Sequence, residues 1–216
     1  MDVSIKELKY NFDVNFFGPV ITLQQAAPFI KKRGGGSVVI MQSNAAYISK
    51  ASPFAQVGLA SSYIASKTAA ASISRIAAGL SKSHNISVYG LGPTVYLTEM
   101  NIEGTKKMGI TPQVFAEDNN WVFRGVAADP VAIAKVLEHF FEGTSKYPAG
   151  SNILVEHEYT LDSQVLYNFI ERDELPTPSS LIPQLNLLNG DPAYLTEEKV
   201  EKTIREYKNS LKRDEL

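Results

Sequence analysis

The sequence predicts an α/β domain with a parallel, doubly wound sheet and flanking helices, and two observations carry this prediction. Three short apolar runs, at residues 37–42, 86–91 and 151–155, have the composition of strands that are buried on both faces. Segments in which apolar residues recur at helical spacing precede and separate these runs. Alternation of helix and strand is typical of parallel sheets, because a helix makes the crossover. We therefore expect the three strands to run parallel.

The composition favours a folded protein and excludes several classes of function. The 216 residues are 44% hydrophobic and 20% charged, which is enough apolar material for a core. A net charge of -2 argues against a general binder of nucleic acid or anionic membranes, and the absence of cysteine excludes disulfides and thiolate chemistry. No apolar run reaches the roughly 20 residues of a membrane span, and the three histidines lack metal-ligand spacing. We expect a cytoplasmic protein without a metal site.

Residues 5–33 are predicted to form one amphipathic helix. Apolar residues recur there every three or four positions, and Ser4 and Glu7 fit a capping box at its start. Pro19 has no N–H to donate to the carbonyl of Asn15. The helix should therefore kink at this point, and the free carbonyl beside the Asn15 amide is a suitable place to hold a water.

Two further helices are predicted between the strands. The segment 61–80 is rich in small residues, which permit close approach of a neighbouring helix, and it follows a polar stretch at 42–62. A helix over 130–141 begins with proline, whose missing N–H costs little in a first turn. Residues 99–120 are polar and are expected to be irregular.

The pattern changes after Asp162, where prolines separate three short segments with helical character. These segments span 165–170, 181–188 and 197–212. We expect them to form a helical C-terminal appendage. The predicted division is a domain over 1–160 and an extension over 161–216.

Several polar residues stand where an active site is expected. Tyr63 and Lys67 lie four residues apart, so both face one side of their helix, although such a pair also arises by chance in a chain of this composition. Ser43 ends the first strand, at the carboxyl edge where parallel-sheet enzymes place reactive groups. Pro93 and Thr98 follow the second strand at a short distance.

In order and setting, these residues resemble the short-chain dehydrogenase/reductase family. The resemblance covers about residues 4–158 and includes Val-Asn-Phe-Phe-Gly at 14–18, the strand and serine at 36–43, Tyr-Ile-Ala-Ser-Lys at 63–67 and the Gly-Pro loop at 92–100. It implies a partial Rossmann-like fold and an NAD(P)-dependent oxidoreductase acting on an alcohol or carbonyl substrate. The implied catalytic residues are Asn15, Ser43, Tyr63 and Lys67, and the implied contacts to NAD or NADP are Tyr63, Lys67, Pro93, Val95 and Thr98.

The resemblance also implies a role for each catalytic residue. Tyr63 would exchange a proton with the substrate oxygen, and the cation of Lys67 is expected to lower the pKa of Tyr63. Ser43 would donate a hydrogen bond to the same oxygen. Asn15 would hold a water that links Lys67 to solvent, and the nicotinamide would supply the hydride.

The sequence departs from the family pattern at several points. It contains no G-x-G-x-x-G, so by resemblance the chain starts after the fourth of seven strands and lacks the adenosine half of the cofactor site. Thr94 stands where glycine is usual, and an inserted loop around 46–57 lengthens the connection from Ser43 to Tyr63. Glu156 and Glu158 replace part of the family's Asp-Gly-Gly, and we expect both at a solvated strand end.

These departures leave three functional hypotheses open. The first is the oxidoreductase, truncated, with a small-molecule alcohol or ketone as substrate. The second is a non-catalytic binding or scaffold protein derived from the family, and the third is an isomerase or lyase that uses Tyr63 and Lys67 without hydride transfer. The resemblance also implies a homo-oligomer, a dimer through helices 5–31 and 61–80, while the strand at 37–42 is expected to present an open edge.

Overall fold

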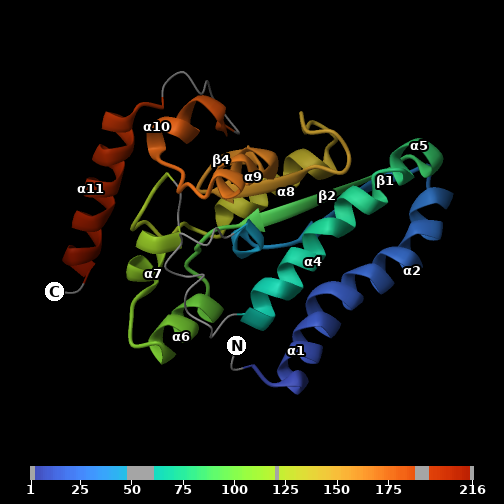
Figure 1. Cartoon of the computed structure of the whole chain (residues 1–216). Helices are drawn as coiled ribbons and strands as arrows, with labels where there is room; N and C mark the ends of the chain where they lie inside the picture. The colour runs from blue at the N-terminus through green and yellow to red at the C-terminus, as the bar shows by residue number, and fades with distance from the viewer. Residues whose placement is uncertain (1–2, 48–60, 120–121, 188–194, 215–216) are drawn as a thin grey trace.

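The computed structural model describes residues 3–47, 61–119, 122–187 and 195–214, and these form a five-stranded sheet flanked by helices (Figure 1). The strand order is β1-β2-β3-β4-β5. The inserted loop expected around 46–57 lies almost entirely outside the described residues.

The three predicted strands are present and parallel, which confirms the predicted class of fold. They are β1 (Gly36–Met41), β2 (Ile86–Pro93) and β3 (Asn152–Glu156), with β2 in the middle. Met41 pairs with Leu91 in the first ladder, and Gly90 pairs with Asn152 in the second. Every residue of β3 is buried, as expected for a parallel strand that is covered on both faces.

Helices cover both faces of this sheet. On one face lie α1 (Ile5–Phe12), the π-helical turn η1 (Asp13–Phe17), α2 (Gly18–Lys32), α4 (Ser61–Ala77) and α5 (Leu80–His84) (Figure 1). On the other face lies α8 (Val131–Phe141), which packs on Tyr89 and Leu91. Val88 of β2, which precedes Tyr89, packs instead with Ile73 of α4. Consecutive residues of β2 therefore face the helices on opposite sides of the sheet.

The irregularity predicted at Pro19 takes the form of a π-helical turn rather than a bare kink. Because Pro19 has no N–H for the carbonyl of Asn15, the helix widens at η1, and the N–H of Gly18 reaches back to the carbonyl of Asp13. The helix then continues as α2 to Lys32.

The segment expected to be irregular contains two short helices, so that prediction was wrong. They are α6 (Glu99–Lys107) and α7 (Pro112–Asn119). A threonine hydroxyl caps the N-terminus of each helix. Thr98 accepts a hydrogen bond from the N–H of Asn101, and Thr111 accepts one from the N–H of Val114. The polar sequence of this segment has no apolar stripe from which the two helices could have been predicted.

The tail adds two strands that the sequence did not predict, so the sheet is mixed rather than wholly parallel. β4 (Tyr159–Asp162) runs antiparallel to β3, and β5 (Asn186–Leu187) runs antiparallel to β4. The helices of this region are α9 (Ser163–Arg172), α10 (Pro178–Leu181), the 3-10 turn η4 (Ile182–Gln184) and α11 (Glu197–Asp214). The helix predicted over 181–188 therefore ends early, and its last part is strand.

The tail shares its core with the rest of the sheet. Leu166, Leu181 and Val200 are buried in one cluster with Leu154 of β3 and Leu161 of β4. The predicted boundary at residue 160 falls within β4, and the division into two domains stays a prediction. Within the described part of the chain, no helix combines the length and the apolar character that a membrane crossing requires.

Candidate active site

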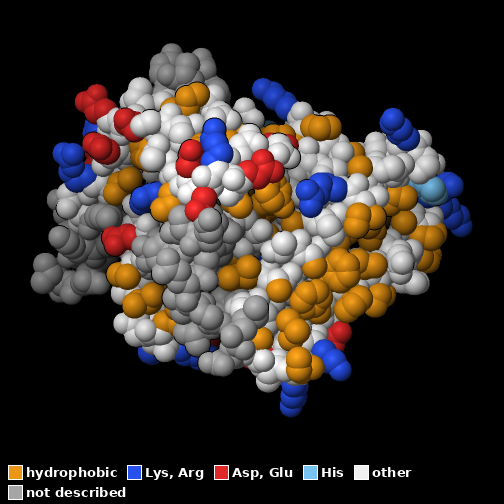
Figure 2. All heavy atoms as spheres, in the orientation of Figure 1, with side chains coloured by type: hydrophobic (Ala, Val, Ile, Leu, Met, Phe, Trp, Pro, Cys, Tyr) orange, Lys and Arg blue, Asp and Glu red, His pale blue; other side chains and the backbone are white. Residues whose placement is uncertain are grey.

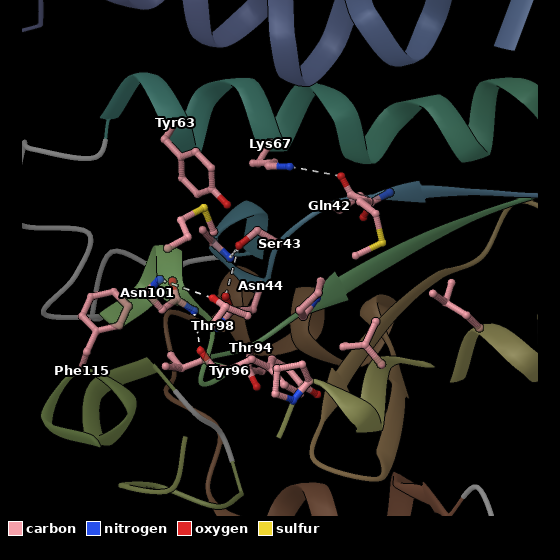
Figure 3. A pocket seen from close by; sticks show the side chains of 18 of the residues that line it. Gln42, Ser43, Asn44, Tyr63, Lys67, Thr94, Tyr96, Thr98, Asn101 and Phe115 are labelled. Atoms are coloured by element: carbon pink, nitrogen blue, oxygen red, sulfur yellow. Dashed lines mark hydrogen bonds between the residues drawn. The ribbon is translucent and has the colours of Figure 1, made fainter. Parts of the chain in front are cut away.

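A cavity of about 720 Å³ opens at the carboxyl ends of β1 and β2 (Figure 3). This is the edge of a parallel sheet at which ligands commonly bind. Its wall comes from the end of β1, from α4, from the segment that follows β2, and from α6 and α8. Of the predicted site residues, Ser43, Tyr63, Lys67, Pro93, Val95 and Thr98 all line it.

Ser43 is fixed at the end of β1 by the turn that follows it. The 3-10 turn η2 (Asn44–Tyr47) begins there, with the N–H of Ala45 donating to the Ser43 hydroxyl at 3.1 Å and the N–H of Ala46 donating to its carbonyl. Only 8% of Ser43 is exposed. The turn therefore holds a buried hydroxyl group on the cavity wall.

Tyr63 stands on the first turn of α4, and its hydroxyl points toward Ser43 (Figure 3). Burial raises the pKa of Tyr63 above 10.0, and a hydrogen bond with Ser43 opposes this shift. The net direction is opposite to the lowering expected from the proximity of Lys67, because burial outweighs the other influences on the pKa of Tyr63. Tyr63 is therefore protonated at neutral pH.

Lys67 lies one helical turn further along α4, on the same side as Tyr63. Its Nζ is 5.7 Å from the centre of the Tyr63 ring and donates to the carbonyl oxygen of Met41 at 3.2 Å. Burial lowers the pKa of Lys67 from 10.5. The amine thus ties α4 to the end of β1.

Asn15 lies outside this cavity, which departs from the expected convergence of all four residues. It lines an adjoining groove of about 530 Å³ beside β1, and Lys67 lines both spaces. Its amide nitrogen donates to the hydroxyl of Ser66 at 3.0 Å, which binds the π-helical turn η1 to α4. The role of Asn15 as holder of a water stays a prediction.

The segment after β2 forms the floor of the cavity. Asn101 donates to the carbonyl of Tyr96 at 2.8 Å, which holds this segment against α6. The buried hydroxyl of Thr94 has no hydrogen-bond partner among the described residues. The sequence had not predicted that Thr94, Tyr96 or Asn101 would line the cavity, although the three-residue spacing from Thr98 to Asn101 is a recognisable helix start.

Comparison with known proteins decides the family. A family model described as short chain dehydrogenase matches residues 1–109, which is half of the chain. The chain belongs to the short-chain dehydrogenase family. The resemblance seen in the sequence is thereby confirmed.

Solved structures of this family have the same fold. L-sorbose reductase from Gluconobacter frateurii, in complex with NADPH and L-sorbose, is 20% identical with a TM-score of 0.60 over 72% of this chain and 59% of its own. Acetoin dehydrogenase from Salmonella typhimurium is 22% identical, with a TM-score of 0.53 over 72% and 56%. A 7α-hydroxysteroid dehydrogenase in complex with NADH and 7-oxo glycochenodeoxycholic acid is 25% identical, with a TM-score of 0.56 over 72% and 56%. The chain thus spans under 60% of the length of these three structures.

A buried polar network lies beside the site of this member of the short-chain dehydrogenase family. Gln42 donates to Asn152 at 2.7 Å and accepts from the hydroxyl of Tyr47 at 3.1 Å, while Ser74 of α4 donates to the same Asn152 oxygen. A Cβ atom on Gly90 would lie 1.9 Å from the Gln42 amide, so a side chain there would displace the network. The network therefore fixes β1, β3 and α4 relative to one another.

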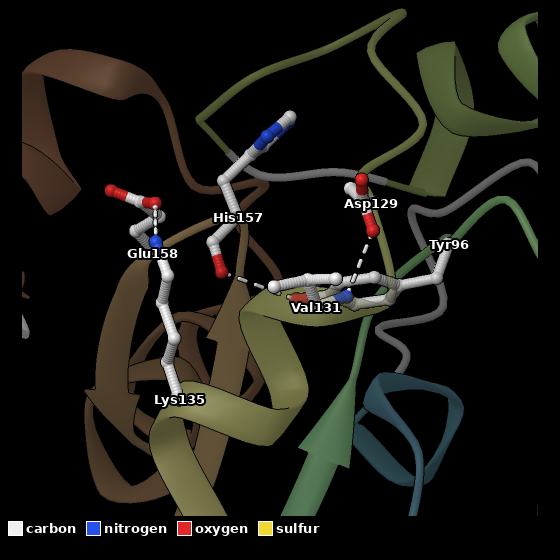
Figure 4. A network of polar contacts seen from close by, with 6 residues as sticks. All are labelled: Tyr96, Asp129, Val131, Lys135, His157 and Glu158. Carbon is white, nitrogen blue, oxygen red and sulfur yellow. Dashed lines mark hydrogen bonds and ion pairs between the residues drawn. The ribbon is translucent and has the colours of Figure 1, made fainter.

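Glu156 corrects the expectation of a solvated strand end. It is 1% exposed, and its carboxylate accepts from the backbone N–H groups of Val122 and Phe123. This segment continues to Ala128, whose N–H donates to the carbonyl of Val95 on the cavity wall at 3.0 Å. Glu158, by contrast, is exposed and forms an ion pair with Lys135 (Figure 4).

His157 occupies the turn between β3 and β4 with a φ of 55°, in the left-handed region. Its ring packs on Phe123, and its Nε2 lies 3.3 Å from the carbonyl oxygen of Val126. The hydroxyl of Tyr96 donates to the carbonyl of His157 (Figure 4). Burial lowers the pKa of His157 to about 4, so the ring is neutral at physiological pH.

Within the described residues, no group of three or more His, Asp or Glu side chains could hold a metal ion.

Replacing Glu156 by glutamine should destabilise the protein. An amide offers one acceptor where the carboxylate offers two, so buried N–H groups of Val122 and Phe123 lose partners. We expect Glu156→Gln to lower the free energy of unfolding by about 2–3 kcal/mol, measured by urea denaturation. The control Glu158→Gln removes an exposed ion pair and should cost under about 1 kcal/mol. Equal effects of the two substitutions would contradict this account.

Protonation of His157 should weaken the fold at acidic pH. The unfolded chain takes up this proton below about pH 6.5, but the folded protein does so only near pH 4, so the stabilisation from the neutral ring is lost as the pH falls through this interval. The loss amounts to about 3 kcal/mol. In His157→Asn, which keeps a residue suited to positive φ, the free energy of unfolding should depend less on pH over the same interval. An unchanged pH dependence would refute the assignment.

Proposed function

We propose that this chain carries the proton-transfer and nicotinamide-side part of an NAD(P)-dependent oxidoreductase that interconverts an alcohol and a ketone. The observation that supports it most is that Ser43, Tyr63 and Lys67 line one cavity, in which the Tyr63 hydroxyl points toward Ser43 (Figure 3). Two of the similar solved structures contain NADPH or NADH, which fits this choice of cofactor class.

The chemistry of the chain's own residues follows from their protonation states. In the reductive direction, protonated Tyr63 gives its proton to the substrate oxygen while Ser43 donates a hydrogen bond to that oxygen. The positive charge of Lys67 then favours the phenolate that Tyr63 becomes. A bound nicotinamide would supply the hydride to the carbonyl carbon.

The chain has residues that could contact the nicotinamide half of the cofactor. Pro93, Val95 and Thr98 line the cavity beside Tyr63 and Lys67, where a nicotinamide ring could lie against them. The 216 residues contain no G-x-G-x-x-G to bind a pyrophosphate through backbone N–H groups. We therefore expect these residues to bind a free dinucleotide poorly.

That missing motif also favours a second candidate function, a binding protein derived from the family. Such a protein would use the same cavity to hold a small molecule without hydride transfer. Turnover separates the two candidates, because only the oxidoreductase consumes a nicotinamide cofactor.

Replacing Tyr63 by phenylalanine should remove turnover without unfolding the protein. The variant lacks the proton donor, so we expect oxidation of NADH or NADPH with a ketone to fall by at least about 100-fold, measured from nicotinamide absorbance. Tyr167→Phe on α9, a residue that does not line the cavity, is the matched control and should retain full activity. If the unaltered chain shows no turnover with either dinucleotide, the second candidate replaces the first.

We further propose that the chain forms a homodimer through its first helices. Tyr10, Val14, Phe17 and Ile21 repeat at helical spacing and are 49–67% exposed, and hydrophobic side chains gather over α1, α2 and α4 (Figure 2). An apolar stripe of this length is well suited to packing against a second copy.

A charge within this stripe should separate the copies. Ile21→Glu is expected to give a monomer in light scattering where the unaltered chain gives a dimer, because a carboxylate buried in the interface is costly. Ile102→Glu on α6 is a matched control outside the stripe and should stay dimeric. A monomer from the unaltered chain would contradict the dimer.

A further inference from the structure

We propose that the active-site cavity accepts an uncharged ketone or secondary alcohol with a mainly hydrocarbon skeleton, and discriminates against substrates that carry a carboxylate or a phosphate. This inference rests on the proposed oxidoreductase function and names its substrate class. It follows from the charges, the helix ends and the hydrogen-bond partners around the cavity.

The described part of the cavity wall has a single charged side chain. Of its 19 described lining residues, Lys67 alone has a charged side chain. The Lys67 amine already donates to the carbonyl of Met41 and faces the ring of Tyr63. Lys67 lies beside Tyr63, at the reacting end of the cavity, so a carboxylate or phosphate held by the rest of the described wall would lose hydration without a cation beside it.

Two of the helices that begin at the cavity, α6 and α8, are also poorly suited to an anion. The N-terminal end of a helix attracts negative charge, but the first turn of α6 already contains Glu99. At α8, the carboxylate of Asp129 accepts from the N–H of Val131 (Figure 4). At these two helix ends the chain itself already supplies a negative charge, and a further negative charge beside them would be repelled.

Much of the described wall is apolar. Ile133 and Leu137 face the cavity from consecutive turns of α8, while Met100 and Phe115 face it from α6 and α7. Such a surface favours hydrocarbon, at about fourfold in affinity for each buried methylene group.

Most polar groups of the wall are already hydrogen-bonded within the protein. Gln42 is bonded to Asn152 and Tyr47, Asn101 is bonded to the carbonyl of Tyr96, and the Tyr96 hydroxyl donates to backbone carbonyls. The buried Thr94 hydroxyl has no partner among the described residues. Beyond the oxygen that reacts, the wall is therefore matched to a substrate with few polar atoms.

A matched pair of ligands tests this inference on the full chain without cofactor. A cyclohexanone that carries a methyl ester is compared with the corresponding carboxylic acid at neutral pH, and binding is measured by calorimetry. We expect the ester to bind at least about tenfold more tightly than the acid, because only the acid must bury a charge. Equal or tighter binding of the acid, or no binding of either compound, would overturn the inference.

A charge added to the wall should reverse this preference. Ala134 lines the cavity yet is exposed, so Ala134→Lys should fold and should bind the acid more tightly than the ester. Phe141→Lys, at the far end of α8, adds the same charge away from the cavity and should leave the preference unchanged. The same reversal in both variants would show a long-range effect of net charge and would overturn the assignment to the wall.

Turnover distinguishes failure of this inference from failure of the proposed function. Faster reduction of the acid than of the ester would overturn the substrate class while the oxidoreductase stands. Selective binding of the ester without any turnover would overturn the oxidoreductase, and the cavity would still select uncharged ligands.

Discussion

The buried hydrogen bonds among Gln42, Asn152 and Ser74 are the interaction on which the rest of the site depends. They lie between the sheet and α4, at the point where Gly90 leaves room for them. Gln42 immediately precedes Ser43 in the chain, and Ser74 belongs to the helix that carries Tyr63 and Lys67. A buried amide with all its partners in place permits only one arrangement of those elements, since any shift would leave polar groups unpaired in a medium of low dielectric.

Local sequence was enough to predict the elements that position the chemistry. The three parallel strands are continuous apolar runs, and the four-residue spacing of Tyr63 and Lys67 places them on one helix face. The carboxyl end of a parallel strand then brings Ser43 to the same edge. The helices α6 and α7, the strands β4 and β5 and the burial of Glu156 were not predictable in this way. The burial of Glu156 and the pairing of β5 depend on partners distant in the chain: Glu156 accepts hydrogen bonds from the N–H groups of Val122 and Phe123, and Asn186 pairs with Thr160.

Burial, rather than pairing of opposite charges, governs the electrostatics of this region. It raises the pKa of Tyr63, lowers that of Lys67 and lowers that of His157, and in each case it favours the neutral form. Glu156, a fully buried carboxylate, accepts hydrogen bonds from backbone N–H groups. Because desolvation sets these protonation states, they are less sensitive to ionic strength than those of an exposed ion pair.

β1 is an edge strand of the sheet formed by the described residues, so its backbone N–H groups differ in their access to solvent. In a parallel ladder, alternate residues turn their backbone groups to opposite sides, and Gly36 and Gln42 both donate toward the β2 side. The alternate residues point the other way: the N–H groups of Ser37, Val39 and Met41 are directed away from β2. On that side, the described residues include no further strand of the sheet. Amide hydrogen exchange along this strand should consequently alternate residue by residue, fast and slow, while the central strand β2 exchanges slowly throughout.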